Sequence, residues 1–335
     1  MRSCHFCRLE RVFGVFNKLL AYHRHKFDPD NFRLVMALLV KNEADFIEAN
    51  IRVHSVLGVD AFVVMDHRSN DGTRDILASL AEEFELHILD QREPTYRQSE
   101  WMTELAGYAR DRLAADWVIC NDADEFWLPQ RGACLKEFLA FKKAYVTCRR
   151  YNMLLDRSAL QAGYRFHDSR LRVDNPVYYG NGDLKRDSVA IVLSKIGPKV
   201  IVNPHGLIKV KGGNHRAKHV ASWLEYHKPY DRLDILPGIA VYHYSLRGYE
   251  HFEKNVRQRK EQLKRDPRVR MGNHYRRWAE LLEQGRLQAE YEKFILAGEE
   301  LRVLQKFGVV TTDDFPSRTI KQALGMTEEV IRKIA

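Results

Sequence analysis

The chain has 335 residues, 45% hydrophobic and 30% charged, so it can bury one large core or two smaller ones. Its net charge of +9 lies at the two ends of the chain. Residues 1–26 carry six Lys or Arg and one Glu, and residues 246–335 carry 19 Lys or Arg and 14 Asp or Glu. Residues 27–245 are nearly neutral, with 29 Lys or Arg and 30 Asp or Glu. No apolar run reaches the roughly 18 residues of a membrane span, and the near-neutral middle argues against a nucleic-acid-binding module.

The cysteines and the start of the chain indicate a reducing compartment. The five cysteines are an odd number, and Cys120 and Cys148 lie in strand-like apolar runs typical of reduced core residues. No signal-peptide pattern precedes the first strand. We therefore expect a cytoplasmic protein.

Residues 1–28 form a basic segment with helical periodicity. Within residues 8–22 the apolar positions recur at a spacing of three and four, and most charged residues fall on the other face. Two interpretations remain open. The helix docks on the core of the protein, or it makes a peripheral contact with the inner face of the cell membrane.

Residues 29–245 alternate between strand and helix patterns. The predicted strands are 33–40, 61–66, 85–90 and 116–121, and the predicted helices are 41–58, 69–84 and 99–115. Near-continuous apolar runs such as RLVMALLV are typical of central parallel strands. Strands joined by helical crossovers predict an α/β fold with a mostly parallel central sheet.

The second half of the chain is mixed. Further strands are predicted in the runs YVTCRRYNML, VAIVLSK, KVIVNP and LPGIAVYHYS, the last covering residues 236–245. Residues 246–335 show few strand signals and predict a helical C-terminal extension, which opens with a basic stretch over 254–277. Two interpretations of this stretch remain open: it is a solvated helix face, or it makes a peripheral membrane contact and holds a phosphorylated or lipid-linked acceptor there.

Polar and acidic residues follow three of the predicted strands. They are Asn42 and Glu43 after the first strand, Asp66, Ser69 and Asp71 after the second, and Asp122, Asp124 and Glu125 after the fourth. Ligands of open α/β sheets bind at the carboxyl ends of the strands, so these residues are expected to share one rim.

The acidic run DADE needs an explanation, because crowded carboxylates repel one another. A divalent cation would neutralise them, and oxygen ligands suit Mg²⁺ or Mn²⁺ shared with a substrate diphosphate. The alternative is that Asp124 or Glu125 caps a following helix and binds nothing.

Two stretches carry a resemblance to a known family. LVKNEADFIEANIRVHSVLGVDAFVVMDHRSNDGT and ADWVICNDADEFWL resemble the nucleotide-diphosphosugar glycosyltransferases of the GT-A (Rossmann-like) fold, in a family-2-like bacterial branch with a KNE opening and a DxDEF signature. The resemblance covers residues 33 to 260. One departure is His67, where family members often carry a second acid.

The resemblance implies roles for the rim residues. Asn42 and Glu43 would lie against the nucleoside of a nucleotide-diphosphate sugar donor, and Asp66 would accept a hydrogen bond from the base or ribose. Ser69 and Asp71 would shape the neighbouring loop. Further roles concern the acidic run: Asp122 would contact the ribose or a metal-bound water, and Asp124 would be the main protein ligand of Mn²⁺ or Mg²⁺.

A histidine is expected to complete the metal shell. His243, in VYHYS, is predicted to lie close enough to Asp124 to share the ion. If both bind it, the imidazole nitrogen and the Asp124 carboxylate oxygen lie within about 3 to 4 Å of each other. The alternative ligands are His215, in KGGNHRA, and Asp122. Trp127, beside the acidic run, is predicted to stack on the sugar.

The catalytic base is not clear from the sequence. An inverting transferase needs a carboxylate near the acceptor hydroxyl, and the available acids are Asp174, Asp183 and Asp187. A retaining enzyme would need no dedicated base.

The expected function is metal-dependent transfer of a sugar, with inversion, to a glycan, lipid-linked or surface-polysaccharide acceptor. The alternatives are a nucleotidyltransferase-like enzyme on the same fold, and a non-catalytic basic module that binds nucleic acid or membrane.

Overall fold

The computed structural model describes residues 5–161, 163–177, 191–223, 235–268 and 273–326, and the chain divides into two compact units. Unit 1 comprises residues 1–150 and 197–241, and unit 2 comprises residues 151–196 and 242–335. The predicted domain boundaries after residues 28 and 245 stay a prediction.

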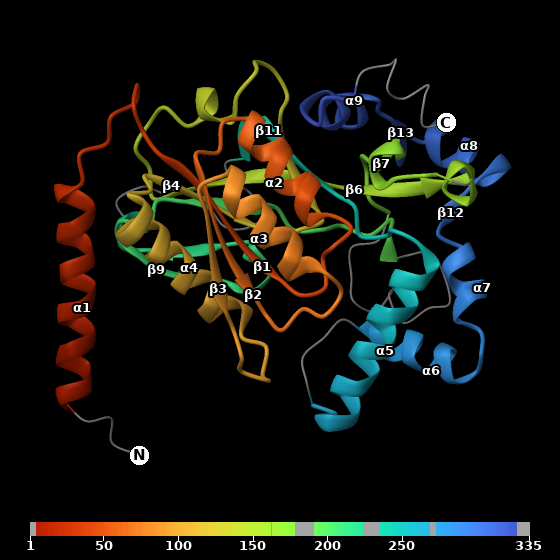
Figure 1. The fold of residues 1–335 in the computed structure, drawn as a ribbon, viewed down its shortest axis with the longest axis horizontal. Coiled ribbons are helices and arrows are strands. Elements are labelled where there is room, and N and C mark those ends of the chain that lie inside the picture. The colour runs from red at the N-terminus through yellow and green to blue at the C-terminus, as the bar shows by residue number, and fades with distance from the viewer. Residues whose placement is uncertain (1–4, 162, 178–190, 224–234, 269–272, 327–335) are drawn as a thin grey trace. The chain divides into compact units, whose positions relative to one another are not determined.

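Unit 1 is built on a mixed sheet with a parallel centre (Figure 1). Its strands follow the order β6-β8-β4-β1-β2-β3, in which β4, β1, β2 and β3 are parallel and β8 is antiparallel to both of its neighbours. The bounds are β1 Leu34–Val40, β2 Ala61–Asp66, β3 Leu86–Asp90, β4 Trp117–Asn121, β6 Tyr145–Asp156 and β8 Lys199–Val202. The predicted α/β fold and its four parallel strands are confirmed.

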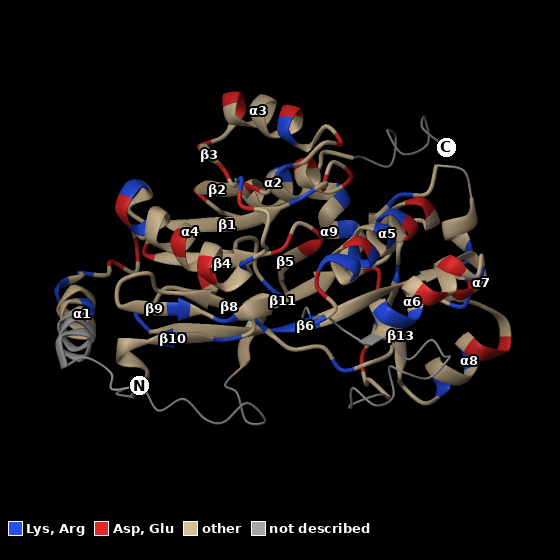
Figure 2. Ribbon diagram, turned by 90° about the horizontal axis from the view of Figure 1, so that it is seen from below, with Lys and Arg blue, Asp and Glu red and all other residues tan. Residues whose placement is uncertain are grey.

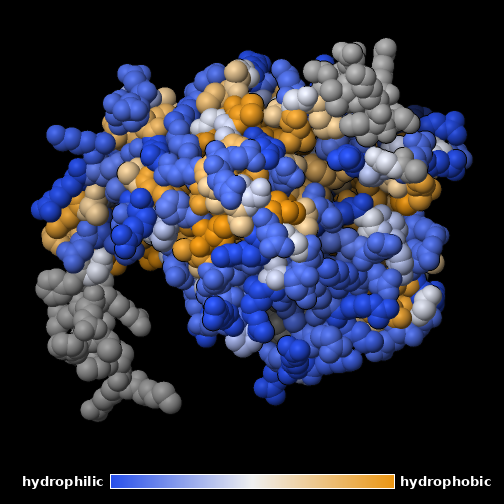
Figure 3. All heavy atoms as spheres, in the orientation of Figure 1, coloured by the Kyte–Doolittle hydropathy of each residue, from blue (hydrophilic) through white to orange (hydrophobic). Residues whose placement is uncertain are grey.

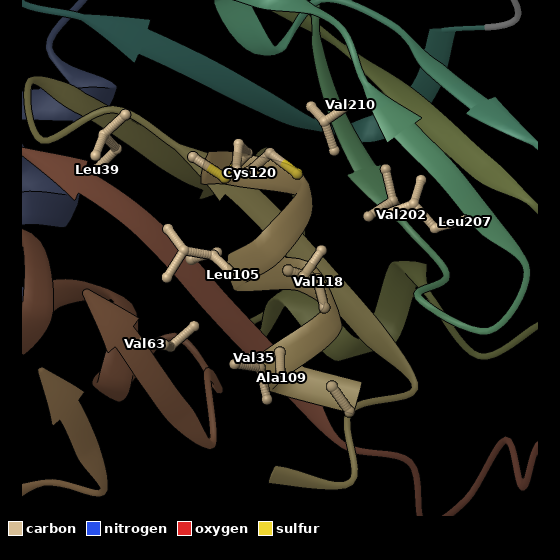
Figure 4. Close-up of a cluster of buried hydrophobic side chains, with 14 of the residues drawn as sticks. Val35, Leu39, Val63, Leu105, Ala109, Val118, Cys120, Val202, Leu207 and Val210 are labelled. Atoms are coloured by element: carbon tan, nitrogen blue, oxygen red, sulfur yellow. The ribbon is translucent and has the colours of Figure 1, made fainter. Parts of the chain in front are cut away.

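Helices cover both faces of this sheet. They are α2 Ile47–Val56, α3 Thr73–Glu83 and α4 Gln98–Leu113. Figure 4 shows Leu105 and Ala109 of α4 against Val35 and Val63 of the sheet, in a fully buried cluster. Each buried aliphatic side chain of this kind contributes about 1.5 to 3 kcal/mol to folding. Side chains alternate between the faces of a strand, so the intervening residues of β1 face α2.

The acidic run leads directly into a strand. β5 (Glu125–Pro129) begins within the run and pairs with β11 (Ile235–His243). The alternative that Asp124 or Glu125 caps a following helix is therefore wrong. The remaining elements of unit 1 are η1 Leu135–Phe138, β9 Leu207–Val210, η6 Gly212–Asn214, β10 Ala217–His219 and η7 Val220–Trp223.

Helix α1 (His5–Arg24) docks at its C-terminal end on unit 1. Tyr22 is 8% exposed and packs with Ala144, Val220 and Ala221. The ammonium of Lys142 donates to the Tyr22 carbonyl at 2.7 Å, where the helix ends. This contact favours the docked interpretation for that end. At the left of Figure 3, the described part of α1 shows hydrophobic beside hydrophilic surface. Among the described residues, no helix is long and apolar enough to cross a membrane.

Unit 2 is largely helical, which confirms the predicted helical C-terminus. Its helices are α5 Tyr249–Arg265, α6 Asn273–Glu283, α7 Leu287–Glu292, α8 Gly298–Lys306 and α9 Phe315–Ala323, with η2 Arg157–Leu160, η3 Phe166–Asp168 and the short strands β7 Leu171–Val173, β12 Ile295–Leu296 and β13 Val310–Thr312. Phe252, Trp278 and Phe294 form the centre of its core. Figure 2 shows acidic and basic residues alternating along α5, and Lys264 pairs with Glu261 at 2.9 Å.

One predicted strand in unit 2 differs. The run VAIVLSK lies partly outside the described residues, and its described part, 191–195, forms a turn with a single bridge. Val192 and Leu193 are buried in the core of unit 2. Their apolar character therefore reflects burial rather than an extended strand.

Candidate functional site

The carboxyl ends of three parallel strands meet at one rim of the unit 1 sheet. Val40 of β1 lies opposite Asp66 of β2, and Leu38 of β1 lies opposite Asn121 of β4. Asn42 and Asp122 follow these strand ends directly, so the three predicted rim residues lie on the same edge. The predicted placement is confirmed, while the roles assigned to these residues in donor binding stay a prediction.

The loops after β1 and β2 are joined by hydrogen bonds between side chain and backbone. Asn42 adopts a left-handed conformation with φ of 59°, and its backbone N–H donates to Ser69 Oγ at 2.9 Å. In return, the Asn70 N–H donates to Asn42 Oδ1 at 2.9 Å, and the Ser69 N–H donates to Asp66 Oδ1 at 3.1 Å. The side chains of Asn42 and Asp66, for which the resemblance implies contact with the nucleoside, thus help to fix the shape of the rim, together with Ser69 of the neighbouring loop.

A second set of bonds ties these loops to the start of α3. The N–H of Thr73, its first residue, donates to Asp71 Oδ1 at 3.1 Å, and the Glu43 N–H donates to Thr73 Oγ1 at 2.8 Å. The carboxylate of Asp71 also accepts from the Ala44 N–H at 3.4 Å. An acid at a helix N-terminus is favoured by the helix dipole, so Asp71 stabilises the loop as well as the helix.

Two basic side chains from other strands supply counter-charges to the acidic run, which the sequence did not predict. The fully buried ammonium of Lys199 contacts Asp122 Oδ2 and lies 3.1 Å from Glu125 Oε2. Glu125 is also fully buried, and Arg150 donates to its Oε1 at 2.7 Å. Asn214 donates to Asp122 Oδ1 at 3.2 Å. Burial raises the pKa of Asp122, and the nearby Lys199 ammonium opposes that shift.

These contacts add a second reason why the crowded carboxylates are tolerated. Lys199 and Arg150 balance the charge of Asp122 and Glu125. Lys199 heads an apolar strand and Arg150 lies within a largely buried one, so a basic residue in a buried run was the available signal.

A divalent cation still fits the remaining donor set. Among the described residues, no group of three or more His, Cys, Asp or Glu could hold a metal on its own. Magnesium sites that act on phosphates need only one or two carboxylates, because the substrate supplies further oxygens. Asp124, half-buried in the turn between β4 and β5, matches that requirement.

His215 carries its imidazole in a form suited to metal binding. Its Nδ1 lies 2.8 Å from the Pro198 carbonyl, which can only accept, so Nδ1 holds the proton and Nε2 holds the lone pair. Burial lowers the pKa of His215 to about 4, which keeps the ring neutral near pH 7. His215 directly follows Asn214, the residue that donates to Asp122.

The prediction for His243 stays a prediction. Its Nδ1 lies 2.8 Å from Asn152 Oδ1, and both residues belong to unit 2. Asp124 belongs to unit 1, and the placement of the two units relative to each other is not determined.

Trp127 belongs to a buried polar network instead of a sugar-binding surface. Its side chain is fully buried, and its indole N–H donates to Asn121 Oδ1 at 2.8 Å. The same network includes Asn50 and His54 of α2, neither of which was predicted. The predicted stacking on a sugar is corrected, because the ring has no exposed surface. Two polar residues four apart on the apolar face of α2 were the signal for this network.

The candidate catalytic bases remain unassigned. Asp183 and Asp187 lie outside the described residues. Asp174 belongs to unit 2, where its carboxylate lies 3.6 Å from the Arg172 guanidinium and its N–H donates to the Val309 carbonyl at 2.9 Å.

Comparisons with known proteins give similarity in structure alone. Neither protein-family models nor curated proteins match the sequence. Residues 1–349 of S. aureus TarS in complex with UDP are 11% identical, with a TM-score of 0.34, over 69% of this chain and 65% of that one. Glucosyl-3-phosphoglycerate synthase from Mycobacterium tuberculosis, in complex with Mn²⁺, UDP and glucosyl-3-phosphoglycerate, is 15% identical with a TM-score of 0.28, over 57% of this chain and 61% of that one.

A third structure, 4-diphosphocytidyl-2C-methyl-D-erythritol synthase, is 14% identical with a TM-score of 0.26, over 40% of this chain and 67% of that one. The chain spans just under two thirds of the first two structures. Similarity at these TM-scores carries no argument about activity.

Proposed function

We propose that the chain is a metal-dependent glycosyltransferase that uses a nucleotide-diphosphate sugar as donor. The observation that supports this function best is the shared rim: in-register parallel strands bring Asn42, Asp66 and Asp122 to one edge, and Asp124 follows in the next turn. Open α/β sheets bind nucleotides at this edge.

The rim residues would divide the work of holding the donor. Asp66 and the loop that Asn42 and Ser69 stabilise would receive the nucleoside. Asp122 would bind the ribose or a metal-bound water, with Lys199 keeping its carboxylate oriented. Each of these groups is fixed by protein contacts before the donor arrives, which lowers the cost of binding.

Asp124 and His215 would hold Mn²⁺ or Mg²⁺, with His243 as the alternative imidazole ligand. When bound, the ion would offset the charge of the leaving diphosphate. A neutral imidazole is an acceptable third ligand for Mn²⁺, and the Nδ1-protonated form of His215 presents the required lone pair.

The acceptor belongs to the same proposal. We infer a carbohydrate or lipid-linked acceptor that is glycosylated with inversion in the cytoplasm, near the inner face of the membrane if α1 contacts lipid. The exposed Val15 and Phe16 of α1 are compatible with that contact.

A ligand screen followed by one substitution tests the proposed function. UDP-, GDP-, CMP- and dTDP-sugars are screened by thermal shift with and without Mn²⁺, since a ligand that binds the native state raises Tm by mass action. Asp124→Asn should keep the Tm of the ligand-free protein and lose the Mn²⁺-dependent shift and donor hydrolysis. Glu82→Gln, which removes one exposed carboxylate from α3, is the matched control.

Two results would contradict the proposal. One is the absence of any Mn²⁺-dependent shift with all four donors, and the other is full donor hydrolysis by Asp124→Asn. Release of pyrophosphate from a nucleoside triphosphate, without sugar transfer, would favour the nucleotidyltransferase alternative.

A further inference from the structure

Helix α2 holds the acidic turn through two side chains on its buried face. Asn50 Nδ2 donates to the Ala123 carbonyl at 2.8 Å and to the Glu125 carbonyl at 3.0 Å. These are the carbonyls on either side of Asp124. Asn50 is fully buried, so water does not compete for its amide.

The second side chain, His54, lies one helical turn further along α2. Its Nε2 accepts from the Trp127 N–H at 3.0 Å, and its Nδ1 lies 2.7 Å from the Asn50 carbonyl. The carbonyl can only accept, so Nδ1 carries the proton and Nε2 is free to accept. His54 therefore bonds the backbone at Trp127, two residues beyond Glu125, the last residue that Asn50 bonds.

Together the two side chains contact alternate residues of the segment that runs from the acidic turn into β5. The bonded backbone atoms belong to Ala123 in the turn and to Glu125 and Trp127 in β5. Asn50 thereby fixes the 123–124 and 125–126 peptide groups, and the peptide group between them is held by the Glu125 N–H, which donates to the Asp122 carbonyl at 3.1 Å. Together these bonds fix the direction in which the Asp124 side chain leaves the backbone.

We propose that Asn50 and His54 are positioning residues for Asp124, and that they set the affinity of the metal site without touching the metal. This inference rests on the function proposed above. Residues that orient a metal ligand from behind alter metal affinity or activity by about 10- to 100-fold when they are replaced.

The test compares Asn50→Ala with Ile51→Ala. Ile51 is the next residue on α2 and is fully buried, so its truncation destabilises the same helix without removing a side-chain hydrogen bond to the acidic turn. Mn²⁺ is titrated into each protein with UDP, GDP, CDP and dTDP in turn, and free Mn²⁺ is followed by electron paramagnetic resonance. Asn50→Ala is expected to raise the Kd for Mn²⁺ by about 10- to 100-fold, whereas Ile51→Ala changes it by less than about twofold.

Hydrogen exchange without metal gives a second readout. Amides of residues 122–127 should exchange faster in Asn50→Ala than in Ile51→Ala at matched Tm. Equal Mn²⁺ affinity in the two variants overturns the inference, even if both lower Tm.

If Asn50→Ala does not fold, the inference is tested with two substitutions of His54. His54→Gln keeps an acceptor for the Trp127 N–H and should stay within about threefold of the wild-type Mn²⁺ affinity, whereas His54→Leu removes it and should lose about tenfold or more. Equal affinities in this pair also overturn the inference. A wild-type protein that binds no Mn²⁺ with any nucleotide contradicts the proposed function itself, which separates the two failures.

Discussion

Replacing Lys199 by Met should destabilise unit 1 strongly. The ammonium is fully buried and contacts two carboxylates, one of them on the fully buried Glu125. Met has a similar length and no charge, so little packing is lost and the main effect is an uncompensated buried negative charge. Breaking a buried ion pair by removing one partner costs about 3 to 5 kcal/mol.

Urea unfolding at pH 7 measures this loss, with Lys218→Met as the control because Lys218 is exposed on β10. The control should stay within about 0.5 kcal/mol of wild type. Adding Glu125→Gln to Lys199→Met should recover part of the loss, because residue 125 then no longer buries a negative charge that lacks Lys199, and a double-mutant cycle gives the coupling. A loss for Lys199→Met as small as that of the control would refute the view that Lys199 balances the acidic run.

Two further substitutions follow from the same contacts. Burial lowers the pKa of His54 to about 4 from an ordinary value of 6.5, so the folded state takes up that proton only well below the pH at which the unfolded chain does. The neutral His54 therefore stabilises the folded state above about pH 6.5, and this stabilisation is lost as the pH falls toward 4. The loss in the free energy of unfolding is about 3 kcal/mol in total. Urea unfolding between pH 7 and pH 4 should show a shallower pH dependence for His54→Gln than for wild type. Asp71→Ala removes the acceptor of the Thr73 N–H at the start of α3 and should cost about 1 to 2 kcal/mol in the same assay, and a cost near zero would mean that solvent replaces the bond.

The parallel sheet could be predicted closely because three of its parallel strands, β1, β2 and β4, are buried along their whole length. The run at 33–40 became β1 (Leu34–Val40), and the run at 61–66 became β2 with the predicted bounds. Burial on both faces leaves a continuous apolar run, which is a strong signal over a short stretch. The rim followed from the sheet, since parallel strands must end on the same edge.

The partners of the acidic run could not be predicted, because they come from distant parts of the chain. Lys199 lies 77 positions from Asp122, and Asn214 lies 92 positions from it. A single sequence carries no record of such contacts. The prediction that a metal binds the crowded carboxylates stays a prediction, and it was made without knowledge of the two protein cations beside them. Trp127 was misplaced for a related reason, since a residue beside a site in sequence can point into the core.

The acidic turn is held from two sides by protein groups. Asn50 and His54 fix its backbone, while Lys199 and Arg150 balance the carboxylates of Asp122 and Glu125. A site built this way does not need a cation in order to fold, unlike sites whose ligands repel one another until the metal arrives. Removing divalent cations with EDTA, in the absence of nucleotide, should therefore change Tm by less than about 1 °C, whereas the Mn²⁺-dependent shift with a bound donor should disappear. A large fall in Tm with EDTA alone would mean that a metal, and not Lys199, holds the turn together.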